Sequence, residues 1–358
     1  MESNPIPEHL NETIFHEGHL RISLNAYASL QTVDLLQRTV YGTHGPRYRQ
    51  TGQEVKVQHM TNPHYFDLYA GEQLIGTYCL SGRQIQLPVG PTQSLYGRYF
   101  SIDPLFGGKG YGSLLKSHAI QYLEKRIQAP FLFYSYVEES NERSMRISKK
   151  DGYQSMAILD AVLFSRLYPK ADARVSRLSS HELPLIQSLL NSTYQAYTLV
   201  QFDQVYYSQN YFVLKEKGEI IAGIQANPIR WQIVEMPGLS GQFVMRLLPR
   251  FPLLRRLFNP HNHQFVALEA AYVRPGREDT LFSLMESVLT HFGFTSALWV
   301  QDINSPFYPL VTSGKLGLLN AMQKSIRTHV MVKSIGLKEN QIKVYPQQPI
   351  YVSGFDLS

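Results

Sequence analysis

Apolar and polar residues follow two different periods along the first half of the chain, and their order predicts a mixed α/β fold. Runs rich in β-branched and aromatic residues predict strands at 95–102, 131–137 and 153–167. Apolar residues three or four positions apart predict a helix that starts near residue 111 and a second one over 141–150. The order is therefore strand, loop, helix, strand, helix, strand, which is typical of an α/β domain with a mixed sheet.

The residues before this block predict helices followed by a hairpin. Apolar residues recur at helical spacing between Leu24 and Leu36, so we expect the stretch 20–60 to be helical. Two short strands then flank a turn signal at 70–72.

After a linker at 168–172 the same order of elements returns. A second hairpin turns at 217–219, and a strand over 265–273 precedes another amphipathic helix. This is an internal repeat at the scale of a domain. The chain has 358 residues, more than the ~250–300 at which single cores usually divide. We therefore predict two domains of similar build, at 1–168 and 173–358.

Composition narrows the class of protein. Hydrophobic residues make up 44% of the chain, which is ample for packed cores. The single cysteine, Cys79, allows no intramolecular disulfide and suits the cytoplasm, and we expect neither a secretory signal nor a membrane span. The net charge of +6 suits an anionic ligand, but no basic run with interleaved aromatics predicts a nucleic-acid partner. His261 and His263 lack a third ligand nearby, so we expect no metal site.

A glycine-rich segment follows the strand at 95–102. It contains Gly107, Gly108, Gly110 and Gly112. Glycine lets a backbone approach a ligand closely or adopt a positive φ. A helix that starts in such a loop points unpaired N–H groups and the positive end of its dipole at an anion, most often a phosphate. The spacing fits neither the dinucleotide-binding G-x-G-x-x-G pattern nor the P-loop pattern.

The segment 102–104, Ile-Asp-Pro, together with 107–112 resembles the coenzyme A loop of the GNAT acetyltransferases, R/Q-x-x-G-x-G/A after a strand that ends V-x-P. The one departure is Gly107, where the family has Arg or Gln. The main-chain cradle does not need that side chain, and Lys109 can supply part of the missing charge. A second block, V-x-x-x-N-x-x-[small] followed by G-[aromatic], is matched by Val137, Asn141, Ser144, Gly152 and Tyr153. The resemblance covers about residues 20–168.

The second half keeps the pattern of elements but not the loop. Residues 273–275 mirror 102–104, and the loop after them is Gly276-Arg277-Glu278-Asp279. It has one glycine, and two carboxylates stand where phosphates would lie. The chain thus resembles the tandem GNAT proteins, with a degenerate C-terminal half and one cofactor site.

The resemblance implies an N-acetyltransferase that moves an acetyl group from acetyl-CoA to a primary amine of a small molecule or peptide by direct attack. The sequence carries no signal for the identity of the acceptor or for an oligomeric state. The implied cofactor contacts come from the splayed strand, the loop and the second block, at Ser101, Ile102, Gly107, Gly108, Lys109, Gly110, Tyr111, Gly112 and Asn141. Asn141 also has the plainer interpretation of a helix cap.

The reaction needs a base for the acceptor ammonium and an acid for the departing thiolate. We predict Glu138 as the base, with Tyr136 lining the cleft; Glu139 is as close in sequence, and a solvated charge is the plainer interpretation of either carboxylate. Many family members place the acid as a Tyr seven residues after the Asn, a position held here by Ser148. Serine is a weak acid, although it could hold a water. This departure favours the alternative of a non-catalytic GNAT-fold binding or regulatory protein that keeps its coenzyme A site.

The segment 243–258 is both basic and apolar. Contact with a membrane or an acyl chain is one interpretation of it. We favour two short helices, interrupted at Pro249 and Pro252, that cover the second sheet or close the acceptor cleft.

Overall fold

The computed structural model describes residues 11–43, 45–322, 325–338, 341 and 348–357. The chain forms two compact units. The first unit holds Met1–Thr43, Arg49–Met156 and Thr328–Tyr345, and the second unit holds His44–Tyr48, Ala157–Arg327 and Pro346–Ser358. The division into 1–168 and 173–358 stays a prediction. The compact units differ from it chiefly because 157–168 lies in the second unit and 328–345 in the first.

The first unit is built on a mixed sheet. Its strands, in spatial order, are β1 (Asn11–Glu17), β2 (Leu20–Asn25), β4 (Pro63–Ala70), β5 (Gln73–Leu87), β6 (Gly90–Ile102), β7 (Phe131–Glu138) and β14 (Arg327–Ile335). Neighbouring strands are antiparallel except for the parallel pair β6 and β7. The strand β2 corrects the expected helical stretch at 20–60, because Ile22 and Leu24 point into the core of a sheet rather than along a helix face.

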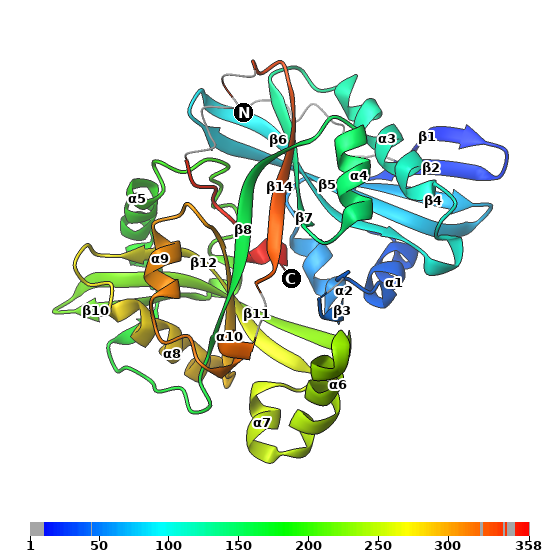
Figure 1. The fold of residues 1–358 in the computed structure, drawn as a ribbon. Coiled ribbons are helices and arrows are strands. Elements are labelled where there is room, and N and C mark those ends of the chain that lie inside the picture. The colour runs from blue at the N-terminus through cyan, green and yellow to red at the C-terminus, as the bar shows by residue number, and fades with distance from the viewer. Residues whose placement is uncertain (1–10, 44, 323–324, 339–340, 342–347, 358) are drawn as a thin grey trace. The chain divides into compact units, whose positions relative to one another are not determined.

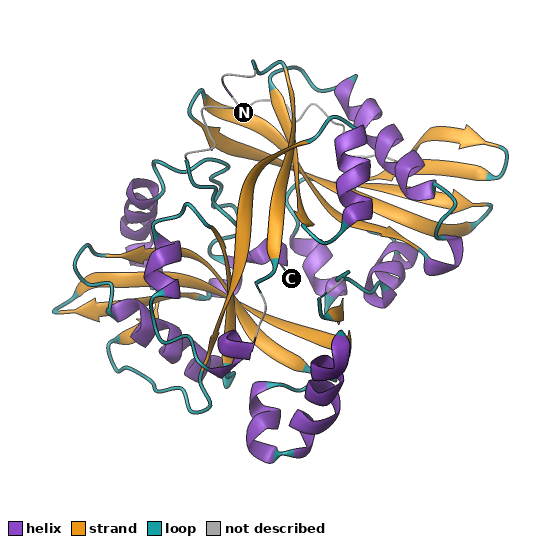
Figure 2. Cartoon of the chain, viewed as in Figure 1, coloured by secondary structure: helices purple, strands orange, loops and turns teal. Residues whose placement is uncertain are grey.

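Helices cover both faces of this sheet. On one face lie α3 (Tyr111–Glu124) and α4 (Glu142–Lys150), with a core that includes Leu115, Phe133 and Val137. The opposite face packs residues of α1 (Leu30–Arg38), where Leu36 meets Tyr65. The short helix α2 (Gln53–Lys56) follows α1 along the chain. Figure 2 shows the helices against the strands.

The second unit repeats this plan. Its strands, in spatial order, are β8 (Gln154–Ser165), β13 (Ser296–Asp302), β12 (His263–Val273), β11 (Glu219–Glu235), β10 (Tyr211–Glu216) and β9 (Val175–Arg177), and β3 (Arg47–Gln50) pairs with β11. Again one pair, β12 and β13, is parallel. The helices are α5 (Leu183–Thr193), α6 (Gly238–Leu247), α7 (Pro252–Leu257), α8 (Thr280–Phe292), α9 (Phe307–Thr312) and α10 (Leu318–Met322). The internal repeat predicted from sequence is therefore present.

Each unit takes its last sheet strand from an unexpected part of the chain. In the first unit β14 pairs antiparallel with β7, from Thr328↔Glu138 to Ile335↔Phe131. In the second unit β8 pairs antiparallel with β13, from Ser296↔Ser165 to Asp302↔Leu159. Local patterns predict that these segments are strands but carry no information on their partners.

No helix in the described part of the chain is long and apolar enough to cross a membrane.

Candidate functional site

The turn after β6 is fixed by one aspartate. The Asp103 carboxylate accepts the Leu105 N–H at 3.0 Å, which caps the 3₁₀ turn Pro104–Phe106. Its other oxygen lies 2.6 Å from the Arg38 guanidinium of α1. Because Asp103 is almost fully buried, this ion pair ties the start of the loop to the helix on the other face of the sheet.

The loop that follows presents a row of backbone N–H groups. Gly108 and Gly110 have φ of 79° and 82°, and a Cβ on either would meet no heavy atom within 4 Å. In the described part of the chain, no hydrogen-bond acceptor is found for the amides of 108–113, and the first helical bond into α3 runs from Leu114 N to Gly110 O at 3.1 Å. Open space above unpaired amides at a helix start is the arrangement that binds a phosphate. Gly108 and Gly110 thus have the backbone conformation of an open loop, and the role of the four glycines in cofactor binding stays a prediction.

The other loop residues have distinct roles. The Gly107 N–H bonds back to Pro104 O at 3.1 Å, so this amide closes the turn. A Cβ on Gly112 would lie 3.2 Å from the Phe100 ring, so the glycine lets α3 pack closely on β6. The Lys109 ammonium lies 5.3 Å from the centre of the Phe106 ring, within the same loop. Tyr111 is the first residue of α3.

Strands β6 and β7 part directly below this loop. They pair in parallel from Gln93↔Phe131 only as far as Gly97↔Ser135, although both strands continue. A bulge at Tyr99, whose φ is 53°, redirects β6 at this point. The predicted splay is therefore present, with Ser101 and Ile102 beyond it. The Ser101 hydroxyl lies 2.6 Å from that of Thr39 in α1.

Asn141 caps the start of α4. Its side-chain oxygen accepts the Ser144 N–H at 3.0 Å. This is the plainer interpretation of the residue. The side chain is half-buried, so its amide group can still donate to a ligand.

Ser148 lies on the buried side of α4 and is 1% exposed. Its hydroxyl accepts a hydrogen bond of 2.8 Å from the Lys116 ammonium of α3. That ammonium also lies 4.4 Å from the centre of the Tyr153 ring. Burial lowers the pKa of Lys116 to about 8, opposed by the nearby charge of Asp151 and helped by Lys333.

Sequence reasoning missed Lys116. Its signal was available, because Lys116, Ala119 and Leu123 share a helical face that is otherwise apolar. A lysine on such a face indicates a buried cation with a specific partner.

Tyr136 and Glu138 face the other way. Side chains alternate along a strand, and Phe133 and Val137 of β7 belong to the core under α3 and α4. Tyr136 and Glu138 therefore point to the opposite face, where the Tyr136 ring packs against Tyr96 at 5.2 Å between centroids. Glu138 is half-buried at the end of β7, opposite Thr328 of β14. The structure thus places Ser148 on one side of the sheet and the other two predicted catalytic residues on the other side.

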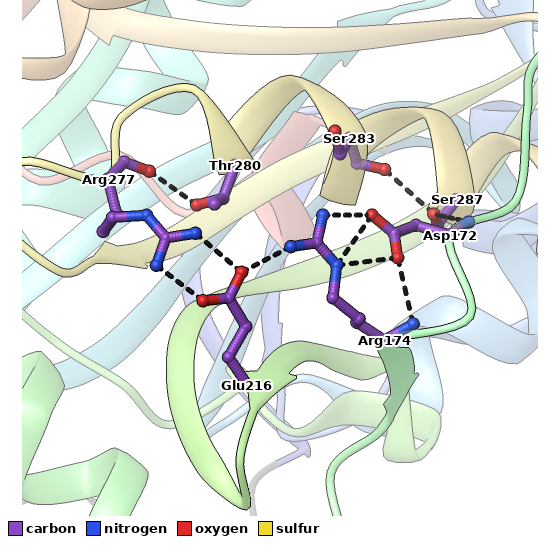
Figure 3. A network of polar contacts seen from close by, with 7 residues as sticks. All are labelled: Asp172, Arg174, Glu216, Arg277, Thr280, Ser283 and Ser287. Carbon is purple, nitrogen blue, oxygen red and sulfur yellow. Dashed lines mark hydrogen bonds and ion pairs between the residues drawn. The ribbon is translucent and has the colours of Figure 1, made fainter.

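The corresponding loop in the second unit is closed by its own charges. Figure 3 shows Glu216 between two arginines. Arg277 donates to both carboxylate oxygens at 2.6 Å, and Arg174 pairs with the same carboxylate and with Asp172. Glu278 accepts the Gly276 N–H at 2.9 Å. The N–H groups of Gly276, Arg277, Thr280 and Leu281 all have acceptors here, unlike those of 108–113 in the first unit.

The splay of the second unit is also occupied. Strands β12 and β13 pair only at Val266↔Ala297 and Ala267↔Leu298. Beyond that point the segment 349–357 contacts both strands. Buried Glu269 accepts from Tyr351 and from the Phe355 N–H at 2.9 and 3.1 Å, and Asp302 accepts the Ile350 N–H at 2.9 Å.

No cluster of three or more metal-ligating side chains occurs among the described residues. His263 lies at the start of β12, and burial lowers its pKa to about 4.

Comparisons with known proteins agree with this geometry. Residues 30–153 match the model of the acetyltransferase (GNAT) family. The fold is similar to N-myristoyltransferase from Saccharomyces cerevisiae with bound myristoyl-CoA, at a TM-score of 0.62 and 8% identity over 99% of this chain and 94% of that one. It is also similar to a tandem GNAT protein from the clavulanic acid biosynthesis pathway, at a TM-score of 0.53 and 12% identity over 89% of this chain and all of that one. No curated protein sequence matches the chain. Residues 30–153 thus match the GNAT family, and the chain has a fold similar to that of a tandem GNAT protein.

Proposed function

We propose that the first unit is an N-acetyltransferase that moves an acetyl group from acetyl-CoA to a primary amine by direct attack. The observation that carries the proposal is the row of amides at 108–113, without acceptors in the described part of the chain and directly above the splay of β6 and β7. An anionic, elongated ligand fits that combination: its phosphates meet the amides and its arm enters between the strands. A GNAT fold supports acyl transfer in general.

The residues fit coenzyme A. The amides of 108–113 would hold the pyrophosphate, with Lys109 adding a positive charge. Backbone groups at Ser101 and Ile102 would polarise the carbonyl at the splay, and Asn141 would face the pantetheine arm. Bound acetyl-CoA supplies an activated thioester carbonyl. The space for a phosphate at Gly108 and Gly110, where even a Cβ meets nothing within 4 Å, supports this assignment.

The acceptor would approach from the face opposite α4. Glu138 and Tyr136 point to that face, which supports the proposal that Glu138 takes a proton from the acceptor ammonium and that Tyr136 lines the approach. The new C–N bond forms as the C–S bond breaks, and the electron pair of that bond leaves on sulfur. Glu138 and Ser148 lie on opposite faces of the sheet, so in this proposal the base and the acid would approach the splay from different sides.

The contact between Ser148 and Lys116 compensates for the missing tyrosine. Lys116 donates to the Ser148 oxygen at 2.8 Å, which leaves the hydroxyl proton of Ser148 able to be donated elsewhere. Ser148 can pass that proton to the thiolate while Lys116 replaces it. Since the pKa of Lys116 is lowered to about 8, it is close to that of a thiol (~8.5), and the transfer is nearly balanced.

Release of thiol from acetyl-CoA in the presence of a panel of primary amines tests the proposal. We expect release with at least one amine, and a loss of about 10²–10⁴-fold in turnover for Glu138→Gln. Ser148→Ala should lower turnover and shift its pH profile while leaving the dissociation constant for acetyl-CoA unchanged.

The alternative is a binding or regulatory protein. It predicts tight acetyl-CoA binding with no thiol release for any amine, and the replacement of the family's tyrosine by Ser148 favours it. The single cysteine of the chain, Cys79, is buried and reduced, which supports our placing of either function in the cytoplasm.

A further inference from the structure

One stretch of the second unit carries only positive charge. Between Glu235 and Glu269 the sequence has no acidic residue and four arginines, at 246, 250, 255 and 256. This stretch forms α6, a 3₁₀ turn over Leu248–Arg250, and α7. Figure 1 shows the two helices as a pair beyond the end of β11 in their unit. The short helices interrupted at Pro249 and Pro252 were expected from sequence, and the structure confirms them.

Large aromatic side chains are exposed on this pair. Phe243 is 57% exposed and Phe251 is 50% exposed. Phe243, Arg246 and Arg250 follow the spacing i, i+3, i+7, so they lie along one side of α6 and its extension. Exposed phenylalanines that alternate with arginines are unusual on a surface that only faces water.

Three of the arginines have no polar partner in the described part of the chain. Among the described residues, no hydrogen bond or ion pair is made by the side chains of Arg246, Arg250 and Arg255, and all three are exposed. Arg256 differs, because its guanidinium lies 5.1 Å from the centre of the Tyr168 ring. These three guanidinium groups lie within ten residues of the chain, and like charges close together repel one another unless an anionic partner covers them.

The pair is anchored from behind. Leu257 and Phe258 are buried, and the Arg256 carbonyl accepts the Thr295 hydroxyl at 2.6 Å. Beside this anchor is a polar hollow lined by Arg255, Asn259 and Asn262, among others. Side chains of this kind suit a phosphate or another small anion.

We propose that the α6–α7 pair docks on an anionic membrane surface. Phe243 and Phe251 would enter the boundary between headgroups and acyl chains, and Arg246, Arg250 and Arg255 would meet lipid phosphates. This combination of exposed aromatic residues and unopposed arginines is the signature of a helix that lies in the membrane interface. A nucleic acid would use the same charges but gains little from phenylalanines carried among Val244, Met245 and Leu247. Docking would bring the enzyme to amines at a lipid surface, although it does not depend on the proposed acetyl transfer.

Sedimentation of the full-length protein with vesicles tests the proposal. One set of vesicles is pure phosphatidylcholine, and the other is a 3:1 mixture of phosphatidylcholine and phosphatidylglycerol. We expect binding to the mixed vesicles only, weakened by added salt. Each arginine near an anionic surface contributes about 1 kcal/mol, so Arg246→Gln/Arg250→Gln/Arg255→Gln should lower the partition coefficient about 100-fold.

Two further variants make the result specific. Phe243→Ala/Phe251→Ala keeps the charge and should still bind less tightly, because the apolar contribution is gone. The control Lys125→Gln/Lys170→Gln/Lys217→Gln removes the same charge from exposed positions elsewhere and should bind like the unaltered protein. Far-UV circular dichroism melting establishes that each variant is folded.

The proposal fails if the unaltered protein does not bind the mixed vesicles, or if the control loses as much binding as the arginine variant. Tighter binding to a single-stranded RNA probe than to the mixed vesicles, lost in the same arginine variant, would also overturn it in favour of a nucleic-acid surface.

Discussion

Helices α3 and α8 have the same spacing of buried positions, but they differ in how many backbone N–H groups at their start are available to a ligand. Buried positions match along the two helices, at 112, 115, 116, 119 and 120 in α3 and at 281, 284, 285, 288 and 289 in α8. In α3 the amides before and within the first turn have no acceptor among the described residues. In α8 the Thr280 N–H bonds to Arg277 O at 3.0 Å, the Leu281 N–H bonds to Glu278 O at 3.2 Å, and Glu278 takes the Gly276 N–H.

The places where the parallel strands separate, β6 from β7 and β12 from β13, also differ between the two units. In the first unit the strands part beneath the open loop. In the second unit Glu269 and Asp302 hold the segment 349–357 against the parted strands. The comparison teaches that the packing of a duplicated fold can be kept while the binding chemistry is lost through a few residues. Charges that bind a loop to itself replace glycines that leave its amides available to a ligand.

The largest effect is expected from a charge placed in the open loop. Gly110→Asp puts a carboxylate among the amides and a side chain at a φ of 82°. We expect acetyl-CoA binding to weaken at least about 100-fold, since both strain and charge oppose it. The matched control is Gly276→Asp, which has a φ of 79° in the second loop. Thermal shift with acetyl-CoA should distinguish them, and an equal loss in the two variants would contradict the account.

Removing the residue that fills the second splay should cost stability without creating a site. Tyr351 is 3% exposed, packs on Tyr194 and donates to Glu269. Tyr351→Ala should lower the free energy of unfolding by about 3–5 kcal/mol, through a cavity and an unsatisfied carboxylate. Urea denaturation measures the loss. The number of acetyl-CoA sites should stay the same, because the loop at 276–281 keeps its own hydrogen bonds and its carboxylates. A second site in this variant would show that the segment alone closes the second half.

When the buried positions of α3 and α8 are aligned, Lys116 in α3 matches Met285 in α8. The variant Lys116→Met therefore gives α3 the residue that α8 has at this position. The folded chain lowers the pKa of Lys116 to about 8 from 10.5, which means that the buried ammonium costs stability at neutral pH. The cost is full below pH 8 and disappears as pH rises toward 10.5, where the lysine is neutral in both states. Lys116→Met should therefore stabilise the protein by about 2–3 kcal/mol at pH 7 and by much less at pH 10.

Urea denaturation at the two pH values measures this effect. The loss of the hydrogen bond from the Lys116 ammonium to Ser148 reduces the gain at pH 7. A gain of equal size at pH 7 and pH 10 would mean that Lys116 is not a buried cation.

The smallest effect concerns the charges that close the second loop. The hydrogen bonds from Arg277, followed by the charges of Arg277 and Arg174, lower the pKa of Glu216 to about 2 from 4.5. Its contribution to stability is therefore present above pH 4.5 and lost as pH falls toward 2. Glu216→Gln should melt slightly lower at pH 7 and lose less of its remaining stability in acid. Acetyl-CoA binding should not change, and a thermal shift assay across pH checks both statements.

Much of this arrangement could be predicted from the sequence. The run of glycines at 107–112 indicated an unusual loop, and Gly108 and Gly110 do have a positive φ, which only glycine adopts without strain. The carboxylates of the second loop likewise predict that it holds no phosphate. Helices and strands with clear periods were found, whereas β2 was taken for helix because its apolar residues also fit a helical spacing with those that follow.

Other features depend on contacts between residues far apart in the sequence. The pairing of β14 with β7 and of β8 with β13 is set by register over more than a hundred residues, which no local pattern encodes. The same holds for the hydrogen bond from Lys116 to Ser148. The roles of Glu138 and Tyr136 stay predictions. Alternation along β7 determines the face of the sheet to which each side chain points, but it does not determine what either side chain does in a reaction.

Calorimetric titration of the full-length protein with acetyl-CoA tests the central claim most directly. The open amides at 108–113, and the loop before α8 in which the N–H groups of Gly276, Arg277, Thr280 and Leu281 are already bonded, predict a stoichiometry near one. They also predict no detectable binding for Gly110→Asp. A stoichiometry near two, or a stoichiometry of one that survives Gly110→Asp but is lost in Gly276→Asp, would contradict the assignment of the coenzyme site to the first half of the chain.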